Sequence, residues 1–298
     1  MRGQAGQASI LTIFFMVVLV GCVAAVLDVG AWYRADRKLQ ANTDAAALAA
    51  AQALPEDTGA SLGLAVEYGD KNGGDVDAAD VSFTTAVMPN DTVVVETEHE
   101  APGVFTQLFG YAGVEVHARA AARAGGITEA RYAAPIAVDI KHPLLQCKPL
   151  PCFDEDTELD LTKTGPGAFR LVNIDGSRGG TGPATVADWI RNGYDGYMPL
   201  DWYFSDPGAK FNSSHIKTAM NERIGDELLF PVYDFVKRGG ANFEYHVIGW
   251  VGFHVTDFEA NGSGGKVYGQ FTRVLWEGIM GQTAPDNDFG VRKIALVE

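Results

Sequence analysis

The hydrophobic pattern at the start of the chain is continuous rather than periodic. No charged residue stands between Arg2 and Asp28, and twelve of the eighteen residues from Ile10 to Leu27 are Ile, Leu, Phe or Val. At about 1.5 Å of rise per residue, this run is long enough to cross the hydrocarbon layer of a bilayer, and its side chains favour insertion. A buried core helix would be expected to carry polar residues on one face. The pattern therefore predicts a membrane-spanning helix.

The residues that follow are expected to continue the same helix outside the membrane. From Asp28 to Leu54 the chain is rich in alanine and other helix formers, and Pro55 interrupts the pattern. We expect one continuous helix over about residues 8–54, with Trp32 and Tyr33 at the membrane surface. A face of small residues is expected to pack against partner helices in the membrane: Ala24, Ala25, Gly30 and Ala31.

Between residues 81 and 122 the apolar positions recur with a period of two. The alternation is interrupted by a turn at 89–91 and by a short helical turn at 104–110, where Phe105, Leu108 and Phe109 have the spacing of a hydrophobic anchor. This pattern predicts a three-stranded antiparallel sheet with one solvated face. That face carries a row of glutamates, which we expect to pair with arginines across the sheet rather than to bind a cation: Glu96, Glu98, Glu100, Arg119 and Arg123.

The rest of the chain is predicted to be rich in β-strands, with two short helices at 184–192 and 213–223. The expected strands lie at 136–140, 169–174, 228–236, 245–258, 267–276 and 291–297. The fold class is therefore α+β. We expect three segments: a membrane-spanning and amphipathic helix (1–54), an α/β module (55–125) and a β-rich domain (126–298).

Composition and charge narrow the range of partners. The chain has 298 residues, 47% of them apolar, so it can bury a sizeable core. Its formal charge is −15, which would repel a polyanion, and we therefore expect no nucleic-acid partner.

Cysteines and basic residues give opposite indications of sidedness. Cys147 and Cys152 suit a small disulfide loop, which implies an oxidising compartment. A count of bases near the span would instead place its carboxyl side in the cytoplasm, because Arg34, Arg37 and Lys38 follow it. We favour an exocytoplasmic body with a cytoplasmic amino terminus. An alternative is a lipoprotein anchored at Cys22, since Leu19-Val20-Gly21-Cys22 has the form of a lipoprotein cleavage box.

Few residues in the sequence suggest a metal-binding or catalytic site. Asp175 and Ser177 follow a predicted strand, but a third oxygen ligand is missing, so they are weak metal candidates. The acids from Asp154 to Asp160 lack the glycine and glutamate of a calcium loop and are expected to form an exposed loop. We expect no enzyme activity, cofactor or small-molecule substrate. The alternative is a tethered enzyme or ligand-binding module in 126–298, with polar side chains converging from Asp175, Asp201, His215 or His254.

Two stretches of sequence resemble a known family. The apolar run leads into Asp28-Val-Gly-Ala-Trp-Tyr33 and then Leu39-Gln-Ala-Asn-Thr-Asp-Ala-Ala-Ala47. Together with Val104-Phe-Thr-Gln-Leu-Phe-Gly110, this resembles the amino-terminal module of TadE/TadG-like proteins of Flp (tight adherence) pilus assembly, over residues 1–125. The resemblance implies a single-span protein similar to minor pilins, with a lipid bilayer and other pilus-assembly proteins as partners and a role in pilus biogenesis or adherence.

Overall fold

The computed structural model describes residues 4–74, 76–148, 150–161, 169–206, 210–239, 242–261, 264–283 and 287–297. The fold is mixed α+β, as predicted. It divides into two compact units, the first formed by residues 1–124 together with 294–298 and the second by residues 125–293.

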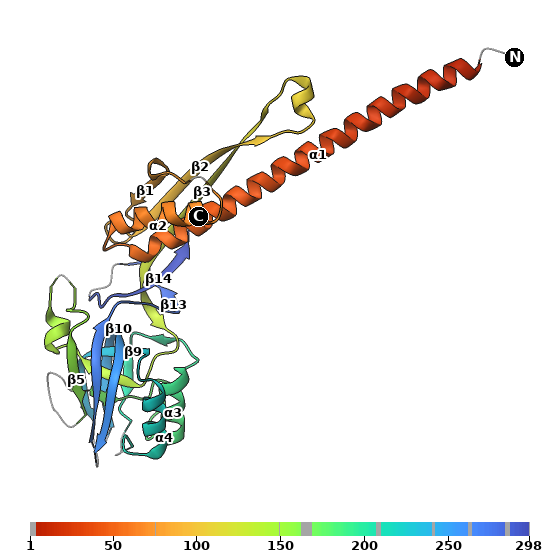
Figure 1. Ribbon diagram of the computed structural model, residues 1–298. Coiled ribbons are helices and arrows are strands. Elements are labelled where there is room, and N and C mark those ends of the chain that lie inside the picture. Colours follow the sequence, from red (N-terminus) through yellow and green to blue (C-terminus); the bar gives the residue numbers. More distant parts are fainter. Residues whose placement is uncertain are drawn as a thin grey trace. The chain divides into compact units, whose positions relative to one another are not determined.

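Helix α1 (Gln4–Ala50) dominates the first unit (Figure 1). It is continuous, as the sequence predicts, and ends in a single 3-10 turn, η1 (Ala51–Ala53), just before Pro55. At about 1.5 Å per residue this is roughly 70 Å of helix. It is the one helix in the described part of the chain that is long and apolar enough to cross a membrane.

The carboxyl-terminal half of α1 packs on a small antiparallel sheet. Helix α2 (Thr58–Lys71) follows, capped by the Asp57 side chain, which accepts a hydrogen bond from the Ala60 N–H. After the 3-10 turn η2 (Ala78–Asp80) come strands β1 (Val81–Thr84), β2 (Thr92–Pro102) and β3 (Gly113–Ala130), paired in the order β1-β2-β3. The core between helix and sheet consists of small side chains, which let α1 approach the strands closely: Ala46, Ala47, Ala50, Val93, Val95, Ala120 and Ala122.

Two details of this unit differ from the prediction. Leu108 lies in the 3-10 turn η3 (Thr106–Phe109) between β2 and β3, where its side chain is 79% exposed, so it does not anchor the turn in a core. Arg119 pairs with Glu96 at 2.7 Å as expected. Arg123 is instead buried in the strand opposite Thr92, away from the solvated glutamate row.

The second unit is built on a large sheet with the strand order β5-β11-β10-β9-β4-β6. Helices α3 (Pro183–Asn192) and α4 (Ser214–Glu222) contact each other and contribute apolar side chains to the same core cluster as the strands. Four fully buried phenylalanines help to fill this core: Phe211, Phe230, Phe253 and Phe271. The strands of this sheet are β4 (Ile136–Asp139), β5 (Asp156–Asp160), β6 (Phe169–Leu171), β8 (Trp202–Phe204), β9 (Glu227–Gly239), β10 (Asn242–Asn261) and β11 (Gly264–Thr272).

Short elements complete the chain. These are η4 (Pro143–Gln146), β7 (Met198–Pro199), β12 (Val274–Leu275), β13 (Gly278–Met280) and β14 (Val291–Leu296). After β14 the chain returns to the first unit, where the Val297 N–H donates to the Ala121 carbonyl.

The structure corrects the prediction for the acidic stretch at 154–160, where we expected an exposed loop. Residues Asp156–Asp160 form β5, which pairs antiparallel with β11 at the edge of the sheet. Leu159 is fully buried, and the flanking acids meet polar partners on β11, including Lys266, whose Nζ lies 2.9 Å from Glu158. Asp156, Glu158 and Asp160 therefore lie on an edge strand, whereas Asp154 lies in the exposed segment before it.

Candidate functional site

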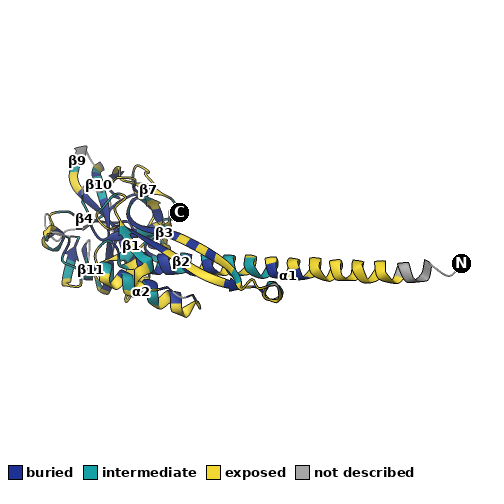
Figure 2. Cartoon of the chain, turned by 90° about the horizontal axis from the view of Figure 1, so that it is seen from above, coloured by how far each residue is buried: buried dark blue, intermediate teal, exposed yellow. Residues whose placement is uncertain are grey.

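Among the described residues, almost none of the apolar stretch of α1 is covered by the rest of the chain. Figure 2 shows the described part of this stretch almost entirely exposed, in contrast to the part of the helix that packs on the sheet. Phe14 is 66% exposed and Val26 is 72% exposed. Water disfavours a continuous apolar surface of this size, whereas the hydrocarbon of a bilayer accommodates it. The exposed helix is therefore the part of the molecule suited to a membrane.

The small residues predicted for helix packing have different surroundings. Ala24 is buried within the chain itself, Ala25 is exposed, and Gly30 and Ala31 are half-buried. A Cβ atom placed on Gly30 would meet no heavy atom within 4 Å. Nothing in its own chain therefore requires a glycine at this position, and packing against a partner helix stays a prediction.

Asp28 connects the end of the apolar stretch to the sheet. Its side chain is 1% exposed, although the residue follows Leu27 directly. Oδ1 accepts hydrogen bonds from the N–H groups of Val104 and Phe105 at 2.9 and 3.2 Å, and Oδ2 accepts from Phe105 and Thr106 at 3.0 and 2.7 Å. The carboxylate thus satisfies three backbone donors at the start of η3. Sequence reasoning missed this contact, because the partners are 76 to 78 residues apart and neither segment carries a local signal of it.

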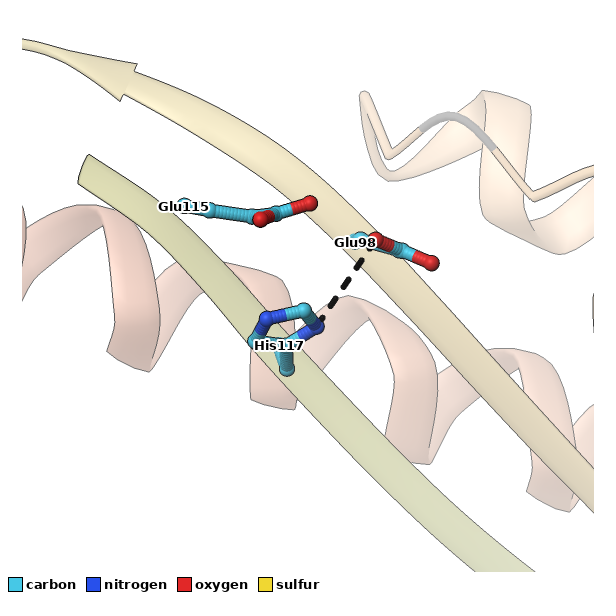
Figure 3. Close-up of side chains that lie close together, drawn as sticks. All are labelled: Glu98, Glu115 and His117. Atoms are coloured by element: carbon cyan, nitrogen blue, oxygen red, sulfur yellow. Dashed lines mark ion pairs between the residues drawn. The ribbon is translucent and has the colours of Figure 1, made fainter. Parts of the chain in front are cut away.

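Three potential metal ligands lie together on the solvated face of the β2–β3 ribbon (Figure 3). Glu98 and His117 are directly opposite in the strand register, with 3.9 Å between Oε2 and Nδ1, and Glu115 lies two residues before His117. Their ligand atoms lie within 4.8 Å of one another, and within the described chain this is the one such group of three. Ligands about 2.1 Å from a zinc ion lie closer together than this, and a structural zinc site has four. All three side chains are exposed, and we make no metal assignment to them.

The metal candidates named from the sequence occupy a surface turn. The Ser177 N–H donates to Asp175 Oδ1 at 2.9 Å, which closes an Asx turn, and both residues are exposed. Neither belongs to the group of three potential ligands found among the described residues.

The cysteines are arranged as the sequence suggests. Cys147 and Cys152 form a disulfide with their Cα atoms 5.6 Å apart, next to η4. Cys22 lies on the exposed part of α1 as a free thiol.

A cavity of about 550 Å³ lies within the second unit. Two polar pairs are on its wall: His246 Nδ1 lies 2.8 Å from Asp234 Oδ1, and Arg292 forms an ion pair with Asp288 at 2.6 Å. Burial alone would raise the pKa of Asp288, but the hydrogen bonds and charge of Arg292 outweigh it and the pKa is lowered.

The four polar residues that the enzyme alternative named do not meet in this cavity. Asp175, Asp201, His215 and His254 are all absent from its lining. His254 instead faces Glu227, with 3.3 Å between Nδ1 and Oε1. The lining that is described therefore holds paired charges and apolar groups from other parts of the unit.

A family model matches residues 6–53 of the chain. No curated protein and no solved structure matches the chain. The matched segment covers less than a fifth of the chain, and it is shorter than the 1–125 over which we noted the resemblance. It contains the exposed apolar helix and most of the alanine-rich continuation, and both features point to a membrane-anchored protein. Residues 6–53 match the family described as "Putative Flp pilus-assembly TadE/G-like".

Proposed function

We propose that this protein is a non-enzymatic, minor-pilin-like component of a Flp/Tad pilus assembly system, held in the membrane by α1. The family match over residues 6–53 is the observation that carries the proposal. The structure supports it physically, because the matched segment is a helix whose apolar stretch lies exposed and whose carboxyl-terminal half is integrated into a folded unit. Such a helix can both anchor a body and present a surface to other membrane helices.

In this proposal the body lies outside the cytoplasm. The disulfide between Cys147 and Cys152 supports this placement, since disulfides persist in oxidising compartments. The body would then be available for pilus biogenesis or for attachment to a surface.

Replacing a glycine on α1 by a larger residue tests the proposed role in pilus assembly directly. Gly21 and Gly30 have room for a side chain within the chain itself, because an added Cβ meets nothing within 4 Å at either position. In a strain that lacks the native gene, we expect the intact chain to restore pili and adherence. The Gly30→Leu variant should reach the membrane in normal amounts and yet restore them poorly, because leucine obstructs close packing of a partner helix.

A matched control separates lost packing from lost stability. Gly63 is also helical, on α2, and also has open space for a Cβ atom, but it is remote from the apolar stretch. Gly63→Leu should restore pili fully. If the strain without the gene makes normal pili and adheres normally, the proposed role is wrong.

The second candidate function is a tethered ligand-binding module. It rests on the cavity in the second unit, where Trp250 is 3% exposed and its Nε1 has no hydrogen-bond partner among the described residues. A buried indole N–H usually finds an acceptor, which a ligand would supply here. If this function holds, Trp250→Phe should weaken the binding of a small molecule found by a thermal-shift screen against the intact chain, beyond the loss of stability that a smaller buried side chain causes by itself.

A further inference from the structure

The loop between β2 and β3, residues 103–112, has the composition of a membrane-contacting segment. No charged residue occurs from Ala101 to Val114, although Glu100 and Glu115 stand directly on either side. Large side chains in this loop point away from the protein, since Val104 is 69%, Leu108 79% and Tyr111 71% exposed. Exposed apolar groups gathered on one loop indicate a surface that is covered in use.

The structure fixes where this loop lies along α1. The hydrogen bonds from Val104, Phe105 and Thr106 to Asp28 hold the start of the loop beside the residue that ends the apolar run. In Figure 2 the exposed stretch of α1 begins next to this loop. If residues 10–27 span the hydrocarbon layer, the loop lies at the level of the membrane surface.

The charge pattern of the β2–β3 ribbon agrees with a loop that lies at the level of the membrane surface. Glu98, Glu100 and Glu115 stand on the stem of the ribbon, behind the uncharged loop. Helix α1 shows the same order, with the apolar stretch first and Arg34 and Arg37 exposed beyond it. Both segments thus change from apolar to charged at the same boundary, as expected where hydrocarbon gives way to water.

We propose that residues 103–112 insert their exposed apolar side chains into the interfacial layer of the same bilayer that α1 spans. The lipid surface is the occupant because the loop is continuous with the membrane-facing part of α1. Tyr111 is suited to this layer, since its ring is apolar and its hydroxyl can reach water. The protein then contacts the membrane at two places, and Asp28 couples them. This inference rests on membrane anchoring by α1 and does not depend on a role in pilus assembly.

Depth-dependent fluorescence quenching of the full chain in nanodiscs tests the insertion. In a Cys22→Ala background, Leu108→Cys and Tyr111→Cys are each labelled with an environment-sensitive dye, while Cys147 and Cys152 remain protected by their disulfide. Discs of phosphatidylcholine with brominated acyl chains should reduce the emission of both labels by about twofold relative to unbrominated discs, as expected for a site within several ångströms of the acyl boundary. A label at Ser82→Cys, an exposed position on β1, should not be quenched.

A label at Val20→Cys, within the apolar stretch, shows separately whether the anchor is embedded. If the Val20 label is quenched and both loop labels behave like the Ser82 label, the loop lies in water and the inference is overturned. The same result is expected if another protein, rather than lipid, covers the loop in the cell. If the Val20 label is not quenched either, membrane anchoring fails and the inference fails with it. The pilus role is tested independently by Gly30→Leu.

Discussion

The carboxylate of Asp28 is buried although it lies just after the apolar stretch of α1. An ionised group buried without partners would be strongly destabilising, and the N–H groups of residues 104–106, at the start of η3, compensate for its burial. The same contact gives the β2–β3 loop a fixed position, because the loop residues Val104 and Leu108 have exposed side chains that contribute little packing. One residue on α1 therefore determines how well a distant loop is ordered.

Removing this carboxylate should loosen the loop. In Asp28→Ala, the amides of residues 104–106 lose an ionised acceptor, and such bonds are each worth about 1.5–3 kcal/mol. We expect their hydrogen exchange to accelerate by about tenfold or more in the full chain in nanodiscs, measured by mass spectrometry. Asp36→Ala, on the same helix, is the control and should leave the loop unchanged. Equal exchange in Asp28→Ala and the native chain would show that packing alone orders the loop.

Asp91 makes the stability of the first unit depend on pH. Burial would raise the pKa of this carboxyl, but hydrogen bonds from the N–H groups of Ala86, Met88 and Val87 and from the Thr92 hydroxyl outweigh it and lower the pKa. A lowered folded-state pKa adds stability that is fully present above the unfolded value, about 3.9, and is lost as pH falls through the folded value.

The Asp91→Asn variant should therefore be less stable at neutral pH, by about 1–3 kcal/mol. The difference from the native chain should shrink as pH falls below about 4, because the carboxyl then takes up a proton in the unfolded chain while it is still ionised in the folded one. Denaturant titrations in detergent between pH 3 and 7 measure both effects. Asp70→Asn, at an exposed position on α2, is the control. A difference that does not vary with pH would contradict the assignment to Asp91.

At the scale of elements, the sequence predicts what periodicity and composition determine. The single long helix, the three strands of the first unit and both short helices of the second follow from patterns over many residues. Strand β5 was missed because its acids outweighed the single buried Leu159 in a five-residue stretch. The contact of Asp28 with η3 and the pairing of Val297 with Ala121 join segments far apart in the chain, so no local pattern predicts them.

The contribution of the disulfide between Cys147 and Cys152 to stability can be tested. A disulfide spanning so few residues is expected to contribute about 2 kcal/mol, because it restricts the unfolded chain only modestly. The double variant Cys147→Ser/Cys152→Ser should thus unfold at lower denaturant concentration by that amount while keeping the same fold. Cys22→Ser is the control and should unfold like the native chain, since that thiol is free. Identical unfolding of the double variant and the native chain would mean that the disulfide adds no stability.

For the molecule as a whole, two opposite orientations in the membrane can be distinguished by experiment. Arg34, Arg37 and Lys38 favour a cytoplasmic body by the rule for flanking charges, whereas the disulfide favours an exocytoplasmic one. Flanking basic residues only bias the orientation of a span, whereas a disulfide depends directly on an oxidising compartment. We therefore give the disulfide more weight and expect the body outside the cytoplasm.

Thiol trapping in intact cells distinguishes the two orientations. In a Cys22→Ala background, the only remaining thiols are Cys147 and Cys152, which are oxidised in an exocytoplasmic body. After rapid acid quenching, we expect a polyethylene glycol maleimide to leave the chain unmodified, and to add two increments of mass once the sample has been reduced. A cytoplasmic body would keep both thiols reduced and take up both increments without reduction. Protease added to spheroplasts should agree, digesting the body only if it lies outside, and disagreement between the two measurements would show that the cysteines do not report the side of the membrane.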